Sequence, residues 1–158
     1  MQPNTANDSL SKEQKLAAIG RLTALWAFAE SGLGGVLHAL QMPFTGLIVG
    51  GLAVIIITLI AKLSVNSFKQ IFKSLIVVLI VKATISPYTP FPAYIAVSFQ
   101  AIVAAILYSL MKVNFVTVLL LSLMAMIESA VQKLLVLTLF FGQSIWKAIN
   151  TFTNFVTK

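Results

Sequence analysis

The segment Trp26–Gly51 reads WAFAESGLGGVLHALQMPFTGLIVGG and stands apart from the apolar sequence around it. It contains a carboxylate (Glu30), the single histidine (His38), a proline at Pro43 and several glycines. Apolar sequence that only crosses a bilayer needs none of these, and a charged side chain at the centre of a membrane helix costs about 2.5–3.5 kcal/mol by insertion scales. The segment therefore predicts a functional site inside the apolar part of the chain.

The composition predicts an all-α integral membrane protein. The chain has 158 residues, of which 59% are hydrophobic and 9% are charged, whereas soluble domains carry about 25% charged residues. Apolar runs such as 51–60 (GLAVIIITLI) do not alternate as the strands of a membrane β-barrel do. We expect residues 1–20 to form a cytoplasmic tail and the interfacial start of the first helix, and residues 21–158 to form one transmembrane domain.

Breaks in the apolar pattern divide the chain into about six expected transmembrane helices in a compact bundle. Ser11 and Gln14 have the spacing of a capping box for the first of them. Proline-bearing loops are expected at Gln41–Gly46 and Ser86–Pro92. The expected helices are Ser11–Leu40, Gly46–Leu63, Phe68–Ile85, Ala93–Met111, Phe115–Val131 and Leu134–Val156; the second half of the last has the pattern of an interfacial helix instead.

The distribution of basic residues orients these helices. With six spans and both termini in the cytoplasm, nine of the eleven basic residues fall on the inner side, and only Lys82 and Lys133 fall in the outer half. Both proline-bearing loops are then extracellular.

The polar residues of the helices converge on the outer half in this topology. We expect a binding pocket that is open to the outside and lined by the following substrate-binding residues: Glu30, His38, Lys82, Tyr88, Gln100, Glu128 and Lys133. Alternative interpretations remain open. The two glutamates either line the site or form structural ion pairs with Lys82 and Lys133. His38 either binds ligand or lies at headgroup level, Gln100 either binds ligand or bonds between helices, and Tyr88 is either a capping residue or an interfacial aromatic.

Small residues recur every four positions on the first helix, at Thr23, Ala27, Ser31 and Gly35. Such a row lets another helix approach closely, either within the chain or from a docking partner subunit. A weak internal similarity, between residues 27–31 (AFAES) and 125–129 (AMIES), favours three helical hairpins of similar plan.

The segment Glu30–Gly46 (ESGLGGVLHALQMPFTG), within a compact chain of this kind, resembles the first helix, loop and second helix of the substrate-binding S components of energy-coupling factor transporters. The resemblance implies a loop that closes over a vitamin-sized ligand. It also implies docking of the first helix on a transmembrane coupling subunit that works with two cytoplasmic ATPases. The expected localisation is the bacterial cytoplasmic membrane, as a multi-pass protein.

The expected function is therefore a membrane-embedded subunit that binds a small polar organic molecule for uptake and that partner ATPases energise. The four candidate charges sum to zero, which favours a neutral or zwitterionic ligand. The main alternative is a structural or assembly subunit of a larger membrane complex, and a lipid-modifying enzyme is a distant third. No nucleotide-binding or nucleophile–base motif is present, and there is no cysteine. We therefore expect no enzymatic activity, no cofactor, no metal and no nucleic-acid partner.

Overall fold

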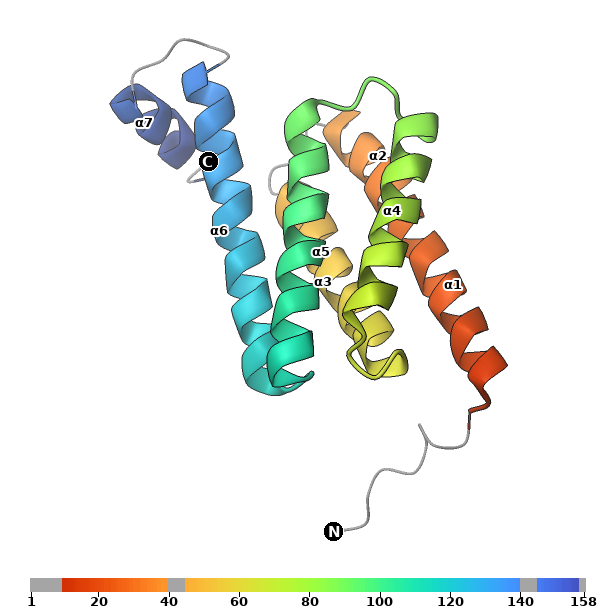
Figure 1. Cartoon of the computed structure of the whole chain (residues 1–158). Helices are drawn as coiled ribbons and strands as arrows, with labels where there is room; N and C mark the ends of the chain where they lie inside the picture. The colour runs from red at the N-terminus through yellow and green to blue at the C-terminus, as the bar shows by residue number, and fades with distance from the viewer. Residues whose placement is uncertain (1–9, 40–44, 140–144, 157–158) are drawn as a thin grey trace.

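The computed structural model describes residues 10–39, 45–139 and 145–156, and within these ranges every regular element is a helix (Figure 1). In chain order these elements are α1 (Lys12–Phe28), the π-helical segment η2 (Ala29–Leu33), α2 (Gly34–Ala39), α3 (Thr45–Leu63), α4 (Phe68–Ile85), α5 (Phe91–Met111), α6 (Phe115–Leu139) and α7 (Ile145–Val156). The all-α prediction is confirmed for the described part of the chain.

Local signals in the sequence explain where several helices begin. The predicted capping box is present at α1, where the Gln14 N–H donates to Ser11 Oγ and the Ser11 N–H donates to Gln14 Oε1. Ser67 caps α4 through the Gln70 N–H. Helix α5 begins two residues earlier than expected and includes Pro92 in its first turn. Proline is tolerated there because the N–H groups of a first turn have no hydrogen-bond partner within the helix.

Helix α3 lies at the centre of the bundle and contacts α1, α4, α5 and α6. Because neighbours surround it, α3 buries side chains on more than one face, including Val54, Ile56, Ile57 and Ile60. Helices α1 and α4 pack together on one flank of α3, and α5 and α6 pack on the other (Figure 1).

The predicted boundary between the fifth and sixth helices is wrong. Helix α6 runs without interruption for 25 residues through Val131, Gln132 and Lys133, and a separate helix α7 of 12 residues follows. A lysine in an apolar run interrupts the hydrophobic pattern, but lysine is a good helix former and does not end a helix. Helix α7 is about 18 Å long at 1.5 Å per residue, which is too short to cross a hydrocarbon core of about 30 Å.

The surface of the bundle is apolar. Large side chains such as Ile55, Leu110 and Phe115 point outward and are exposed, whereas soluble monomers rarely expose large contiguous apolar patches. Three stretches are long and apolar enough to cross a membrane, namely Gly46–Leu63, Phe91–Met111 and Phe115–Gln132. These features are consistent with a membrane protein.

A tight turn joins α3 to α4 and contains a strained residue. Val65 and Asn66 both have left-handed backbone conformations, with φ angles of 54° and 59°. The Asn66 side chain accepts a hydrogen bond from the Val113 N–H at 3.1 Å, which ties this turn to the one between α5 and α6. Left-handed φ suits asparagine but costs other L-residues about 1–2 kcal/mol.

We expect Val65→Gly to stabilise the protein by about 1 kcal/mol, since glycine adopts this conformation without steric cost. The measurement is the free energy of unfolding in mixed micelles titrated with sodium dodecyl sulfate. Val116→Gly is the control, because Val116 is also exposed but lies in α6; glycine there should destabilise the helix slightly. A loss of stability in both variants would contradict the strain at Val65.

Candidate functional site

Glu30 lies in η2, where the helix widens by one residue. The Gly34 N–H donates to Ala29 O, five residues back, rather than to Glu30 O as it would in an α-helix. Lys82 on α4 approaches this point, and its Nζ donates to Glu30 Oε2 at 2.8 Å and to Glu30 O at 3.3 Å. The wide turn and the lysine therefore fit each other: the ammonium group contacts the carboxylate and the carbonyl of the same residue.

The Glu30–Lys82 ion pair is buried. The side chains of Lys82 and Glu30 are only 5% and 6% exposed. Isolated charges in such a place are costly, and a buried pair is tolerated only with close geometry and further hydrogen bonds. The structure thus brings together two predicted site residues that are 52 positions apart in the sequence. The pair is the ion pairing that the sequence left open as an alternative for Glu30.

Four buried side-chain atoms have no hydrogen-bond partner within the described ranges: the donor Trp26 Nε1 and the oxygens Ser31 Oγ, Gln100 Oε1 and Glu128 Oε1. Gln100 is buried on α5, and its amide lies against α3 so closely that a Cβ on Gly50 would be 3.0 Å from Gln100 Nε2. A buried acceptor without a donor costs about 1–3 kcal/mol. These oxygens are therefore able to receive hydrogen bonds from a ligand.

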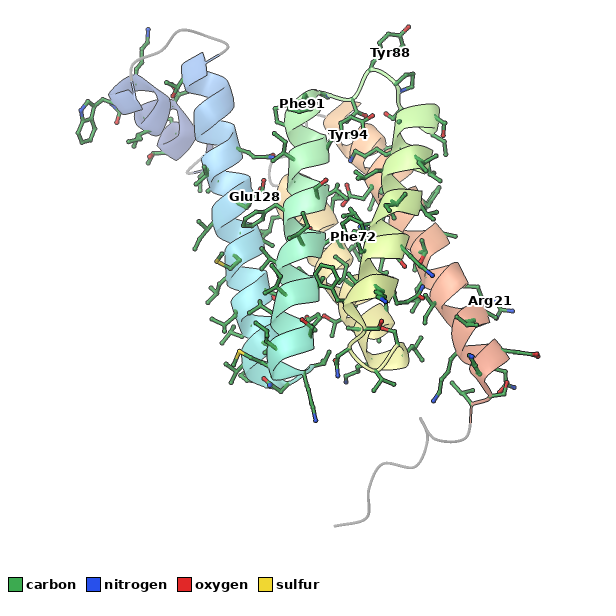
Figure 2. All side chains as sticks on the ribbon, in the orientation of Figure 1. Arg21, Phe72, Tyr88, Phe91, Tyr94 and Glu128 are labelled. Carbon is green, nitrogen blue, oxygen red and sulfur yellow. The ribbon has the colours of Figure 1, made fainter. Side chains whose placement is uncertain are left out.

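Glu128 is half-buried on α6, near the side of that helix that faces α5 (Figure 2). Lys82 is paired with Glu30. The described charged side chains of the cluster (Glu30, Lys82 and Glu128) therefore carry one more negative charge than positive.

Helices α3, α5 and α6 approach each other closely around this cluster. A Cβ on Gly46 would lie 2.6 Å from Ser129 Oγ, so α6 packs almost against the α3 backbone. The Gln132 side-chain amide donates to Pro92 O at the start of α5. Sequence reasoning did not select Gly46, Ser129 or Gln132. The Gly46-xxx-Gly50 spacing is a signal that could have found the first of these contacts.

The other predicted substrate-binding residues are not placed in the cluster. Tyr88 is 98% exposed in the turn between α4 and α5 and extends away from the bundle in Figure 2, so its expected role as a capping residue stays a prediction. The backbones of His38 and Lys133 lie in α2 and α6, and their side chains are outside the described part. The expected loop at residues 41–44 is likewise outside it.

Lys133 lies in the same continuous helix as Glu128, five positions further along α6. Its side chain is outside the described part of the chain, so the structural pairing of Glu128 with Lys133 that the sequence left open stays a prediction.

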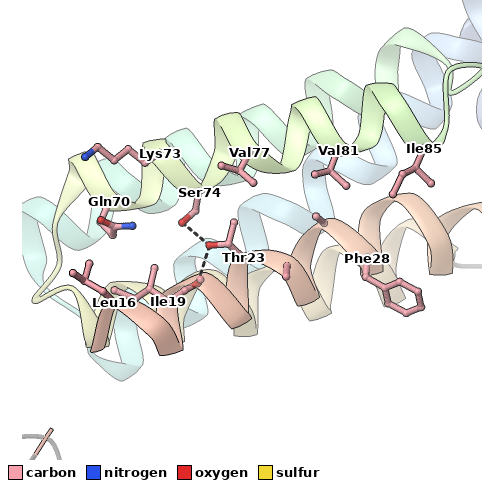
Figure 3. A pocket seen from close by; sticks show the side chains of 13 residues that line it. Leu16, Ile19, Thr23, Phe28, Gln70, Lys73, Ser74, Val77, Val81 and Ile85 are labelled. Atoms are coloured by element: carbon pink, nitrogen blue, oxygen red, sulfur yellow. Dashed lines mark hydrogen bonds between the residues drawn. The ribbon is translucent and has the colours of Figure 1, made fainter. Parts of the chain in front are cut away.

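The row of small residues on the first helix packs mostly inside this chain. Thr23, Ala27 and Ser31 are buried, and Thr23 Oγ1 lies 2.8 Å from both Ile19 O and Ser74 Oγ of α4 (Figure 3). Only Gly35 is exposed, and a Cβ added there would have no atom within 4 Å. The structure favours intramolecular packing over partner docking for the first three residues.

Two hollows lie outside the polar cluster. One is a groove of about 450 Å³ between α1 and α4, and the other is a hollow of about 400 Å³ between α3 and α6 that includes Gly51, Thr58 and Ser122. Neither is lined by Glu30, Lys82, Gln100 or Glu128. The expected pocket open to the outside stays a prediction; of Glu30, Lys82, Gln100 and Glu128, the most accessible is Glu128.

The cluster can hold a cation or a hydrogen-bond donor more readily than an anion. Three of the four buried side-chain atoms without a partner in the described ranges are oxygens, the fourth being the donor Trp26 Nε1, and the described charges of the cluster leave one carboxylate in excess. No group of three or more histidine, aspartate or glutamate side chains that could hold a metal ion occurs among the residues that the structure describes.

Comparison with known proteins adds no assignment. No family model matches the sequence, and neither the curated proteins nor the solved structures gave a match.

Proposed function

We propose that the protein is a non-catalytic, membrane-embedded binding subunit that takes up a small organic molecule carrying a positive charge, such as an amine. The single observation that carries this proposal is the buried Glu128 Oε1, which has no partner within the described ranges, whereas the Glu30 carboxylate is already paired with Lys82. An ammonium group would pair with the Glu128 carboxylate, and its remaining N–H groups would reach acceptors such as Gln100 Oε1.

The proposed ligand differs in charge from the neutral or zwitterionic ligand that the sequence favoured. That expectation counted Lys133 in the site together with Lys82. The proposal counts only the charges that the structure describes in the cluster. These are Glu30, Lys82 and Glu128, and the one carboxylate in excess favours a cation.

The proposed topology has five crossings: α1–η2–α2 as one, then α3, α4, α5 and α6. Basic residues at the end where α1 begins support a cytoplasmic N-terminal side. Helix α7, beside the upper half of α6 in Figure 1, then lies at the outer interface. A sixth crossing, which would return the C-terminus to the cytoplasm, needs more than the 12 residues of α7.

The energy for uptake would come from partners. The resemblance to S components supports a transmembrane coupling subunit with two ATPases in a bacterial cytoplasmic membrane. A structural or assembly subunit is the second candidate, and one observation favours it: Glu30 and Lys82 satisfy each other and need no ligand.

Native mass spectrometry of the protein, purified in mild detergent from its own host, tests the proposal. We expect a small organic adduct of positive formal charge on the wild-type protein. In Glu128→Gln its occupancy should correspond to at least about 30-fold weaker binding, since a buried charge-paired contact is worth about 2 kcal/mol or more. Glu13→Gln, which changes an exposed acid in the first turn of α1, is the matched control and should keep the adduct.

The other outcomes of this experiment would contradict the proposed site, the ligand class or the function. An adduct that persists in Glu128→Gln would overturn the assigned site, and a neutral or anionic adduct would overturn the ligand class. Absence of an adduct, with stable co-purification of other membrane subunits, would support the assembly subunit instead.

A further inference from the structure

The groove between α1 and α4 is polar at one end and apolar along the rest of its length. Figure 3 shows Lys73 and Gln70 at one end, followed along α4 by Val77, Val81 and Ile85. Its α1 side is lined by small residues, Gly20, Thr23, Ala24 and Ala27, between Leu16 and Phe28.

The buried hydroxyl groups that line the groove already have hydrogen-bond partners within the chain. The Thr23 hydroxyl bonds to Ile19 O and to the Ser74 hydroxyl within the chain. Above Gly20 there is open space, with nothing within 4 Å of where a Cβ would be. An apolar chain can therefore lie in the groove without leaving either of these buried hydroxyl groups unpaired.

Lys73 gives the groove its charge. It is the single charged residue that lines the groove, it is exposed, and it has no ion pair within the described part of the chain. It belongs to the end of the bundle where basic residues gather and where Glu13 is the one acidic residue among those described; the basic residues are Lys12, Lys15, Arg21, Lys62, Lys69, Lys73 and Lys112.

The charge and the apolar lining of the groove follow one another along α4. From Lys73 to Ile85, the last residue of the helix, α4 rises about 18 Å at 1.5 Å per residue, and the α4 residues that line this length beyond Ser74 are apolar. A single lipid has a charged head at the membrane interface and apolar acyl chains beyond it, which matches this order of charge and apolar lining.

From these features we infer that the α1–α4 groove binds one anionic phospholipid of the cytoplasmic leaflet, with its phosphate at Lys73 and an acyl chain along Gly20, Ala24 and Val77. Basic pockets between transmembrane helices on the cytoplasmic side commonly bind anionic headgroups. The inference depends on insertion in a membrane and is independent of the ligand proposed for Glu128.

The test is native mass spectrometry of delipidated protein in micelles that contain equal amounts of phosphatidylglycerol and phosphatidylcholine with the same acyl chains. The wild-type protein should retain phosphatidylglycerol about fivefold more than phosphatidylcholine, as expected for one lysine at the membrane surface. Lys73→Gln should remove this preference. Lys69→Gln, an exposed lysine on the same helix that does not line the groove, should keep it.

A second set of variants tests the apolar length. Gly20→Leu fills the open space and should reduce retention of both lipids, and Ala24→Leu serves if the first variant does not fold. Gly51→Leu is the control, since Gly51 is also exposed with open space but lies on α3.

Three results would overturn the inference. They are equal retention of the two lipids by the wild-type protein, a preference that survives in Lys73→Gln, and unchanged retention in Gly20→Leu and Ala24→Leu. A membrane protein that co-purifies in place of lipid, and that Gly20→Leu releases, would show that the groove is a protein-docking site.

Discussion

Replacing Lys82 with methionine should lower the free energy of unfolding by about 3–5 kcal/mol, because it leaves the Glu30 carboxylate buried and unpaired. The same substitution also removes the donor to Glu30 O in η2. The measurement is reversible unfolding in mixed micelles titrated with sodium dodecyl sulfate. Lys69→Met on the same helix is the control; this lysine is exposed, and its loss should change stability by no more than about 0.5 kcal/mol.

A double variant separates lost pairing from lost packing. Glu30→Gln combined with Lys82→Met removes both charges, so most of the stability lost in Lys82→Met should return. If the double variant is as unstable as Lys82→Met, the cost lies in packing around α4 and not in the unpaired charge. If Lys82→Met is as stable as Lys69→Met, the ion pair of the structure does not form in the membrane.

Truncating Trp26 to alanine should destabilise the protein by about 3 kcal/mol. Trp26 is fully buried one turn before Glu30 and is the largest of the fully buried side chains. In a membrane the transfer of the ring from water contributes little, because lipid is as apolar as the core. The remaining loss is that of packing contacts and the cavity left behind, which places the cost at the low end of the range for Trp→Ala.

The only other tryptophan supplies the control for this prediction. Trp146 on α7 is 77% exposed, so Trp146→Ala should change stability by no more than about 0.5 kcal/mol. Intrinsic fluorescence reports on both variants, since each retains a single indole. Equal stability of the two variants would contradict the burial of Trp26 in the bundle core.

The helices that the sequence predicted best are those with strong local signals at both ends. Helix α4 has the predicted bounds, Phe68–Ile85, because Ser67 caps its start and Pro87 follows its end. The division of the last third of the chain was wrong because the break was inferred from the charge of Lys133. Charge affects where a helix lies relative to a membrane, but helix ends depend on backbone propensity and capping.

The candidate site was predictable in part. Glu30, Lys82, Gln100 and Glu128 were selected because polar side chains inside apolar helices are costly, and the structure shows that Glu30 and Lys82 pair. The π-helical turn could not be predicted from the sequence. It is only five residues long, and it shifts the apolar pattern of an α-helix by a single residue. The contact with Lys82 that accompanies it comes from a helix 52 positions away.

By itself the sequence determined that this is an apolar, helical protein with a few polar residues where its helices are buried, because composition and helical spacing are properties of the local chain. Only the tertiary structure decided that Lys82 reaches Glu30, that Tyr88 points away, and that Thr23 and Ala27 face α4. The physical reason is that each of these depends on how helices distant in sequence are rotated and packed around α3. That choice is made by side-chain fit among all of them at once.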